Sequence, residues 1–262
     1  MSIVALATEG STYEPPGVPD FWQPLIGEGA FAVTRASIVI ILSVGLISWL
    51  LLAGTKRMSV VPNRRQAATE VTYGLVRDGV GRDIIGSKEF LRFVPMLFTL
   101  FCLIIVNNVF SIIPVVQFPT MSRVAFPAAL AIFVFVVYHW IGIRKHGFFG
   151  YWKSLVPPGL PVALIPYIFI LELITDLFTR PVTLALRLFG NMFAGHLLLV
   201  LFIGGGEYMI QHGAFGIKLA GIGSLGMGFV MTIFEILVQV LQAYIFTLLT
   251  AIYIAGALAD EH

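Results

Sequence analysis

The chain has 262 residues, of which 58% are hydrophobic and only 11% are charged, and its mean hydropathy is +0.94. A soluble domain usually carries about 25% charged residues, so the sequence predicts a single membrane domain that crosses the bilayer several times. The net charge of +2 is too small to indicate a nucleic-acid partner, and the single cysteine, Cys102, excludes an internal disulfide and a thiol metal site.

The first 30 residues form a polar N-terminal segment. Acidic residues and prolines precede the first apolar run, and no basic region stands before it, so a secretory signal peptide is not expected. An arginine-rich transit segment is also missing, which favours a bacterial protein. The first membrane span is predicted for residues 33–53, about 21 residues and long enough to cross.

A polar stretch over residues 56–88 follows, and it is predicted to hold an amphipathic helix on the membrane surface. Its apolar residues share one helical face, and its charged residues lie on the other. The apolar set is Tyr73, Val76, Val80 and Ile84, and the charged set is Asp78 and Arg82. An irregular cytoplasmic loop is the alternative, because three glycines weaken the helix prediction.

The second span is predicted for residues 93–113 and the third for residues 124–143. Asn107 and Asn108 are the main polar interruption of the second span. Amides at such positions usually hydrogen-bond to neighbouring helices, which is the role we expect here.

Two apolar segments, residues 162–203 and 215–258, are too long for upright spans. Each would measure ~60–65 Å as a helix, whereas the hydrocarbon core is only ~30 Å thick. Each segment therefore holds two short spans, divided in the first case at Pro181, or forms one steeply tilted helix. We favour a hairpin of two long tilted helices over residues 162–258, with the turn beginning at Gly204.

The distribution of basic residues predicts the orientation. Eight lie between residues 56 and 92 and three more between residues 144 and 153, against three on the opposite side of the membrane. By the positive-inside rule the N-terminus is outside. Five crossings then place the C-terminus in the cytoplasm.

Arg187 is the most informative residue, because it stands deep inside an apolar run. An arginine cannot discharge itself by losing its proton, and one held near the bilayer middle costs at least ~2.5–3.5 kcal/mol. At about 100 degrees per residue, five polar residues share its helical face. They are Glu172, Asp176, Arg180, Thr183 and Asn191. The two acids are three to four turns away, so a partner on another chain explains Arg187 better.

A second polar stripe follows the last helix, where Glu235, Gln239 and Gln242 share one face. His196 lies on the face opposite Arg187, and a hairpin turn centred near residue 215 would place it at the depth of Glu235. Structural roles remain open alternatives: Asp176 can form a simple i, i+4 pair with Arg180, and His196 can be merely hydrogen-bonded.

Three motifs carry a resemblance to a known family. Residues 180–196 resemble the signature of subunit a of F-type ATP synthases, residues 234–250 its last helix, and residues 107–114 its second-span motif. The resemblance covers about residues 30 to 258. It implies an all-α fold of about five crossings and a surface helix, whose last two helices are long and tilted around a rotor ring.

The resemblance implies a stator subunit that is not an enzyme alone. It would conduct protons through two offset half-channels to and from a ring of c subunits in the bacterial plasma membrane. Its partners would be that ring, peripheral-stalk b-type subunits, the remaining synthase subunits and membrane lipid, with no cofactor and no metal. Sodium as the coupling ion stays open, because the ring sets ion choice.

Residue by residue, Arg187 matches the family's essential arginine, and Asn191 and Gln242 match its intramembrane amides. Some bacterial members carry an acid where this chain has His196 and a histidine where it has Glu235. The reversed arrangement is similar to that of mitochondrial members, and it leaves open which group binds the proton first. The predicted proton path also includes Gln239, Glu172 and Asp176.

Two other classes of protein remain as alternatives. A proton- or cation-coupled secondary transporter would also bury arginine and glutamate near the midplane, but it should show internal repeats, which the sequence lacks. A haem-binding anchor subunit would need His139 and His196 close together on adjacent spans.

Overall fold

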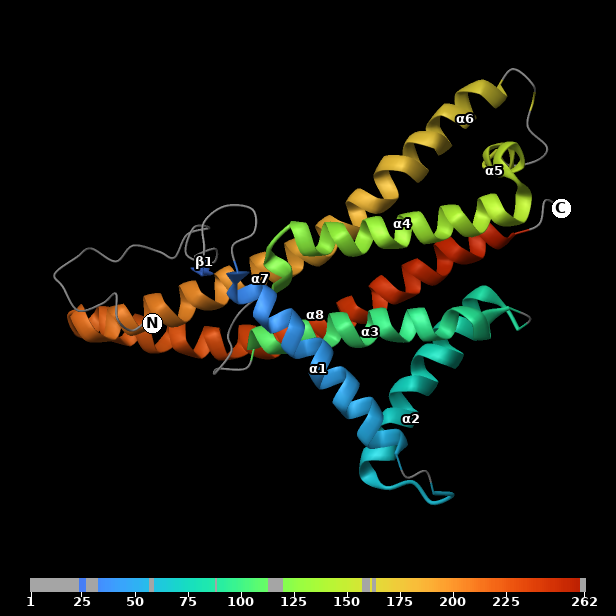
Figure 1. Ribbon diagram of the computed structural model, residues 1–262. Coiled ribbons are helices and arrows are strands. Elements are labelled where there is room, and N and C mark those ends of the chain that lie inside the picture. The colour runs from blue at the N-terminus through green and yellow to red at the C-terminus, as the bar shows by residue number, and fades with distance from the viewer. Residues whose placement is uncertain are drawn as a thin grey trace.

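Five helices of the computed structural model are long and apolar enough to cross a membrane. The structure describes residues 24–26, 33–56, 59–87, 89–112, 120–156, 161 and 164–259. The first three crossing helices are α1 (Arg35–Thr55), α3 (Phe90–Ile112) and α4 (Ala125–His146). Their ends agree with the predicted spans to within a few residues, and the predicted number of crossings is confirmed (Figure 1).

The fourth crossing helix is continuous and is made of α6 (Ile165–Ile174), the π-helical η6 (Thr175–Thr179) and α7 (Arg180–His212). It has 48 residues, and α8 (Phe215–Leu258) has 44. Neither fits upright in ~30 Å of hydrocarbon, so both must tilt. Two long single helices were predicted, and they are confirmed.

As predicted, the fourth crossing helix continues past Pro181. Pro181 lies in the first turn of α7, directly after the π-helical turn of η6. Prolines and π-bulges are the usual causes of helix bends, and the chain changes direction between α6 and α7 (Figure 1).

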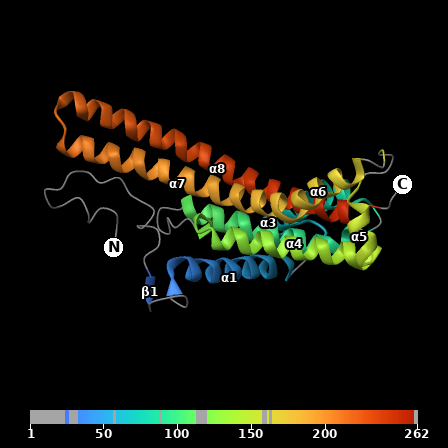
Figure 2. The ribbon, with the colours of Figure 1, turned by 90° about the horizontal axis from the view of Figure 1, so that it is seen from above.

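The hairpin turn begins later than predicted, although it lies close to the expected centre near residue 215. Helix α7 continues through Gly204 and Gly206 to His212, and the turn is at Gly213–Ala214. A Cβ at Gly206 would lie 3.0 Å from the Leu225 side chain and 3.1 Å from the Gly221 carbonyl oxygen. Gly206 therefore permits close packing of two helices rather than a turn. The hairpin projects past the other helices (Figures 1 and 2).

The stretch predicted as a surface helix is helical, so the loop alternative is wrong. It consists of α2 (Arg64–Val76) and the π-helical η3 (Arg77–Ile85). Val76 and Val80 are buried, whereas Asp78 and Arg82 are exposed. The apolar face packs on α3 and α8.

The remaining described elements are short. They are the antiparallel strands β1 (Pro24–Ile26) and β2 (Val33–Thr34), the 3₁₀ turn η4 (Thr120–Ser122) and the helix α5 (Phe148–Ser154). The first span thus starts two residues later than predicted, because Val33 and Thr34 pair as a strand. Apart from this strand pair, all regular elements of the described chain are helices, which confirms the all-α class.

Several predicted segments lie outside the described residues. These are most of the N-terminal segment and of the loop after α5, the link between α3 and η4, and the last three residues.

Helix α3 forms the centre of the bundle. Leu97 and Ile104 on α3 pack in the same buried core as Phe246 and Ile254 on α8. Asn107 donates to Ser43 Oγ on α1 at 2.9 Å, while Asn108 donates to a backbone carbonyl of α8. Both amides therefore join helices, as predicted.

Candidate functional site

Polar side chains gather inside the bundle where α3 and α7 meet α8. On α8, Glu235, Gln239 and Gln242 are three or four residues apart, so they follow one helical face, and all three are buried. Helix α3 contributes a serine and an asparagine, and α7 contributes one asparagine. We call these residues the amide cluster: Asn108, Ser111, Asn191, Glu235, Gln239 and Gln242.

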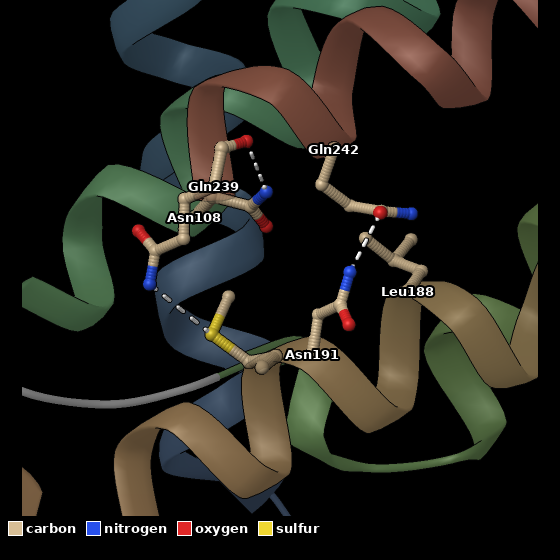
Figure 3. Close-up of a pocket in the computed structure, with 6 residues that line it drawn as sticks. Asn108, Leu188, Asn191, Gln239 and Gln242 are labelled. Atoms are coloured by element: carbon tan, nitrogen blue, oxygen red, sulfur yellow. Dashed lines mark hydrogen bonds between the residues drawn. The ribbon is translucent and has the colours of Figure 1, made fainter. Parts of the chain in front are cut away.

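Gln239 is the centre of the amide cluster. Its Nε2 donates to Ser111 Oγ at 2.8 Å and to Glu235 Oε1 at 3.0 Å. Its backbone oxygen accepts a hydrogen bond from Asn108 Nδ2 at 3.1 Å (Figure 3). Through these bonds Gln239 fixes the Glu235 carboxylate relative to α3.

A second link joins the two arms of the hairpin. Asn191 Nδ2 on α7 donates to Gln242 Oε1 on α8 at 2.8 Å (Figure 3). Beside this bond, a cavity of about 10 Å³ lies between Asn108, Gln239 and Gln242. This is room for about one water molecule.

Four buried polar atoms of the amide cluster have no hydrogen-bond partner among the described residues. They are Asn108 Oδ1, Glu235 Oε2, Gln239 Oε1 and Gln242 Nε2. An unsatisfied buried polar group costs about 1–3 kcal/mol, and each such group in a native structure calls for an explanation. The cluster can therefore bind water, or a proton at Glu235, without breaking bonds that hold the fold.

His196 and Glu235 lie at the same level of the hairpin, as predicted. Their side chains are 6% and 5% exposed. Gly195, the residue before His196, packs against Glu235, since a Cβ there would lie 3.3 Å from the Glu235 carboxyl carbon. An imidazole and a carboxyl group are both able to exchange protons, so the structure brings two titratable groups to one level.

Arg187 is not among the residues that line the cavity of the amide cluster. It is exposed on α7, next to the exposed Leu186, whereas Leu188 is fully buried. Within the part of the chain that the structure describes, Arg187 forms no ion pair. An exposed position of an apolar helix thus carries a permanent charge that no described residue of this chain pairs with.

Asp176 is the centre of a separate polar cluster. Its carboxylate is fully buried, forms an ion pair with Arg180, and lies 3.1 Å from His139 Nε2. Tyr151 Oη donates to the same carboxylate at 3.3 Å, and Tyr138 Oη donates to the backbone oxygen of Asp176 at 2.9 Å. We call these five residues the aspartate cluster. It ties the fourth crossing helix to α4 and α5.

The aspartate cluster also reaches α8, because the Arg180 guanidinium lies 5.3 Å from the centre of the Tyr253 ring. Burial, followed by the Asp176 carboxylate, raises the pKa of Tyr151 above its ordinary value, so Tyr151 stays protonated and donates. The Asp176–Arg180 pair was weighed from sequence. The roles of Tyr138 and Tyr151 were missed, because their contacts join separate helices.

Glu172 is not part of the aspartate cluster. It is half-buried on α6, and it makes no ion pair with any residue that the structure describes. The two acids, one helical turn apart, thus differ in their partners among the described residues.

The geometry argues against a haem held by His139 and His196. His139 contacts Asp176, which lies 20 residues before His196 on one continuous helix. Twenty helical residues span roughly 30 Å, too far for two ligands of one iron. In the described ranges, moreover, no group of three histidine, cysteine or acidic residues is placed to hold a metal ion.

Comparisons with known proteins agree with this architecture. Residues 37–255 match the family model described as ATP synthase A chain. The chain is 44% identical to the ATP synthase subunit a of a Nocardioides species, with 99% of this chain and 98% of the relative covered. It is 38% identical to that of Pseudarthrobacter chlorophenolicus and 36% identical to that of Rhodococcus erythropolis, with at least 96% of each chain covered.

Proposed function

Because the chain belongs to the ATP synthase A chain family, we propose that it is the stator subunit that conducts protons to and from a ring of c subunits. Protons would enter through one half-channel, load a ring carboxylate, and leave through a second, offset half-channel after the ring has turned. That rotation would drive ATP synthesis elsewhere in the complex. The electrical driving force is worth ~2.3 kcal/mol per proton for each 100 mV.

Arg187 is the observation that carries the proposal. A permanent charge on the exposed face of an apolar helix needs a partner or water, and no described residue pairs with it. A ring carboxylate facing Arg187 would supply that partner. The fixed positive charge would favour the ionised carboxylate and would repel protons that could leak between the half-channels.

His196 and Glu235 are assigned to the outer half-channel. Both are buried at one level of the hairpin, and Glu235 Oε2 has no partner within the described chain. The amides of Gln239, Gln242 and Asn191 are suited to order water beside these groups without changing charge. The order in which His196 and Glu235 take the proton stays open.

Glu172 is assigned to the inner half-channel. It is the half-buried acid of the fourth crossing helix and has no ion pair within the described residues. Asp176, which lies on the predicted path as well, is held by Arg180 and Tyr151. We therefore give Asp176 the role of positioning the helix beside that half-channel.

The proposed setting is the bacterial plasma membrane, with the N-terminus outside and the C-terminus in the cytoplasm. The excess of basic residues between residues 56 and 92 supports this orientation. The proposed partners are the c-ring on the Arg187 face, b-type stalk subunits and the rest of the synthase.

Cysteine crosslinking tests the proposed ring contact. In a Cys102→Ser background, Leu186→Cys should crosslink to a cysteine placed beside the ring carboxylate, because Leu186 is 52% exposed next to Arg187. Leu188→Cys is the matched control, since Leu188 is fully buried and should not react. Two outcomes would refute the assignment of this face to the ring. Both variants could crosslink to the same extent, or neither could crosslink in an assembled complex.

A further inference from the structure

A second, larger pocket lies at one end of the bundle, away from the amide cluster. It has a volume of about 410 Å³ and opens where α3 begins and where α4 and α8 end. Figures 1 and 2 show these three helix ends together at the end of the bundle that carries the C-terminus. The proposed proton path does not use this pocket.

The pocket combines basic charge with apolar walls. Arg92 on α3 and Arg144 and Lys145 on α4 contribute three positive charges, whereas Glu89 is the one acid that lines it among the described residues. Its remaining walls include Trp140, 65% exposed, and Leu258. A net positive pocket with an exposed tryptophan is suited to a ligand that is anionic at one end and apolar at the other.

Two of the three bases are available to a ligand. Arg92 and Arg144 are exposed, and neither forms an ion pair with a residue that the structure describes. The Arg92 guanidinium lies 5.9 Å from the centre of the Phe93 ring, which orients it. Lys145 has a structural role, because its Nζ donates to the Leu258 carbonyl at the end of α8.

A purely structural explanation covers only part of this arrangement. Basic residues in the last turn of a helix stabilise its C-terminal dipole, which accounts for Arg144 and Lys145 on α4. It does not account for Arg92, which lies near the start of α3, where a positive charge is unfavourable. Arg92 and Arg144, from different helices, nevertheless line one pocket.

We propose that this pocket binds the phosphate of an anionic phospholipid. Arg92 and Arg144 would hold the phosphate oxygens with paired N–H donors, and the acyl chains would lie along Trp140. Basic residues at the ends of membrane helices are where anionic headgroups lie, and tryptophans are enriched at that depth. Since Lys145 already holds the end of α8, the bound phosphate would brace the ends of three helices.

Photolabelling of the assembled complex tests the proposal. The complex is reconstituted in phosphatidylcholine vesicles with a trace of photoreactive phosphatidylglycerol, and the labelled peptides are identified by mass spectrometry. We expect label on the peptide that contains Trp140, and we expect unlabelled phosphatidylglycerol to compete for it. If additional phosphatidylcholine competed as well as unlabelled phosphatidylglycerol does, binding would not depend on negative charge, and the proposal would be overturned.

The variant Arg92→Gln with Arg144→Gln should lose on the order of tenfold or more of this label, because each basic residue near an anionic surface contributes to binding. The control, Arg64→Gln with Arg65→Gln, removes two exposed charges from α2, outside the pocket, and should keep the label. Arg92→Lys with Arg144→Lys keeps the charge and should keep part of it. Equal labelling of the glutamine variant and the control would overturn the proposal.

Two further arms separate the lipid from other occupants. Inorganic phosphate in excess should leave the label unchanged, and displacement by it would assign the pocket to a soluble phosphate and overturn the lipid proposal. Glu89→Gln should leave the label equal or higher, because Glu89 lines the pocket and an acid repels phosphate. A loss of label in this variant would also contradict the proposal.

Discussion

Arg180 and Arg187 lie two turns apart on the same helix, and their surroundings differ completely. Arg180 forms an ion pair with Asp176 and lies over the Tyr253 ring, whereas Arg187 is exposed and has no ion pair within the described chain. The same costly charge thus has an acid partner at Arg180, and none among the described residues at Arg187. The difference distinguishes a structural arginine from the one to which we assign the ring contact.

The buried acids repeat this contrast. Both carboxylate oxygens of Asp176 have partners, Arg180 on one and Tyr151 on the other, and His139 Nε2 lies 3.1 Å from the second oxygen. Only Oε1 of Glu235 has one, from Gln239, while Oε2 has none among the described residues. A carboxylate held on both oxygens must lose interactions to take a proton, whereas Glu235 has an oxygen ready to receive one.

The largest effect is expected at Arg187. Arg187→Ala should reduce proton-driven ATP synthesis to background while the complex still assembles, because no described residue of this chain depends on Arg187 for an ion pair. Arg187→Lys should not restore full activity, since lysine can lose its proton in an apolar site. The measurement is the rate of ATP synthesis in membrane vesicles. Normal rates in the alanine variant would contradict the functional role that we assign to Arg187.

The next largest effect is expected at the two titratable groups of the hairpin. His196→Leu and Glu235→Leu should each slow proton flux on the order of 100-fold, the scale on which a positioned proton-transfer group acts. Exchanging the two residues, His196→Glu with Glu235→His, should recover part of the flux, because one acid and one imidazole remain. Unchanged flux in both single variants would return these residues to a structural role.

The aspartate cluster should respond in stability. Asp176→Leu leaves the Arg180 and His139 side chains without their acid, and breaking a buried pair in this way costs about 3–5 kcal/mol. The double variant Asp176→Leu with Arg180→Leu should recover most of that loss. Thermal unfolding of the purified complex measures both, and Glu172→Gln is the matched control, because Glu172 has no ion pair within the described residues.

Sequence reasoning succeeded where residue period or segment length decided the outcome. It predicted five crossings, two helices of more than 40 residues, the apolar face that α2 and η3 share, and the shared level of His196 and Glu235. Each of these follows from residue spacing along one helix, or from the symmetry of an antiparallel hairpin.

Contacts between distant helices could not be predicted in the same way. Gly204 was interpreted as the start of a turn, but the glycines at this end of the hairpin let α7 and α8 pack closely, and local sequence does not distinguish these uses. Tyr151 was not singled out, because its bond to Asp176 joins residues 25 positions apart. His139 was considered only as a haem ligand for a related reason, since its acid partner is on another helix.

The smallest effect is expected at Gly195, and it tests how closely the hairpin holds Glu235. A Cβ at this position would lie 3.3 Å from the Glu235 carboxyl carbon and Oε1, so Gly195→Ala should displace the Glu235 carboxylate slightly. Proton flux should fall by no more than about tenfold, with normal assembly. Gly45→Ala on α1 is the control, because a Cβ there would meet nothing within 4 Å. If Gly195→Ala left proton flux at the level of this control, the position of the Glu235 carboxylate would not limit proton transfer. The unpartnered oxygen of Glu235 would then no longer indicate a function that Asp176 lacks.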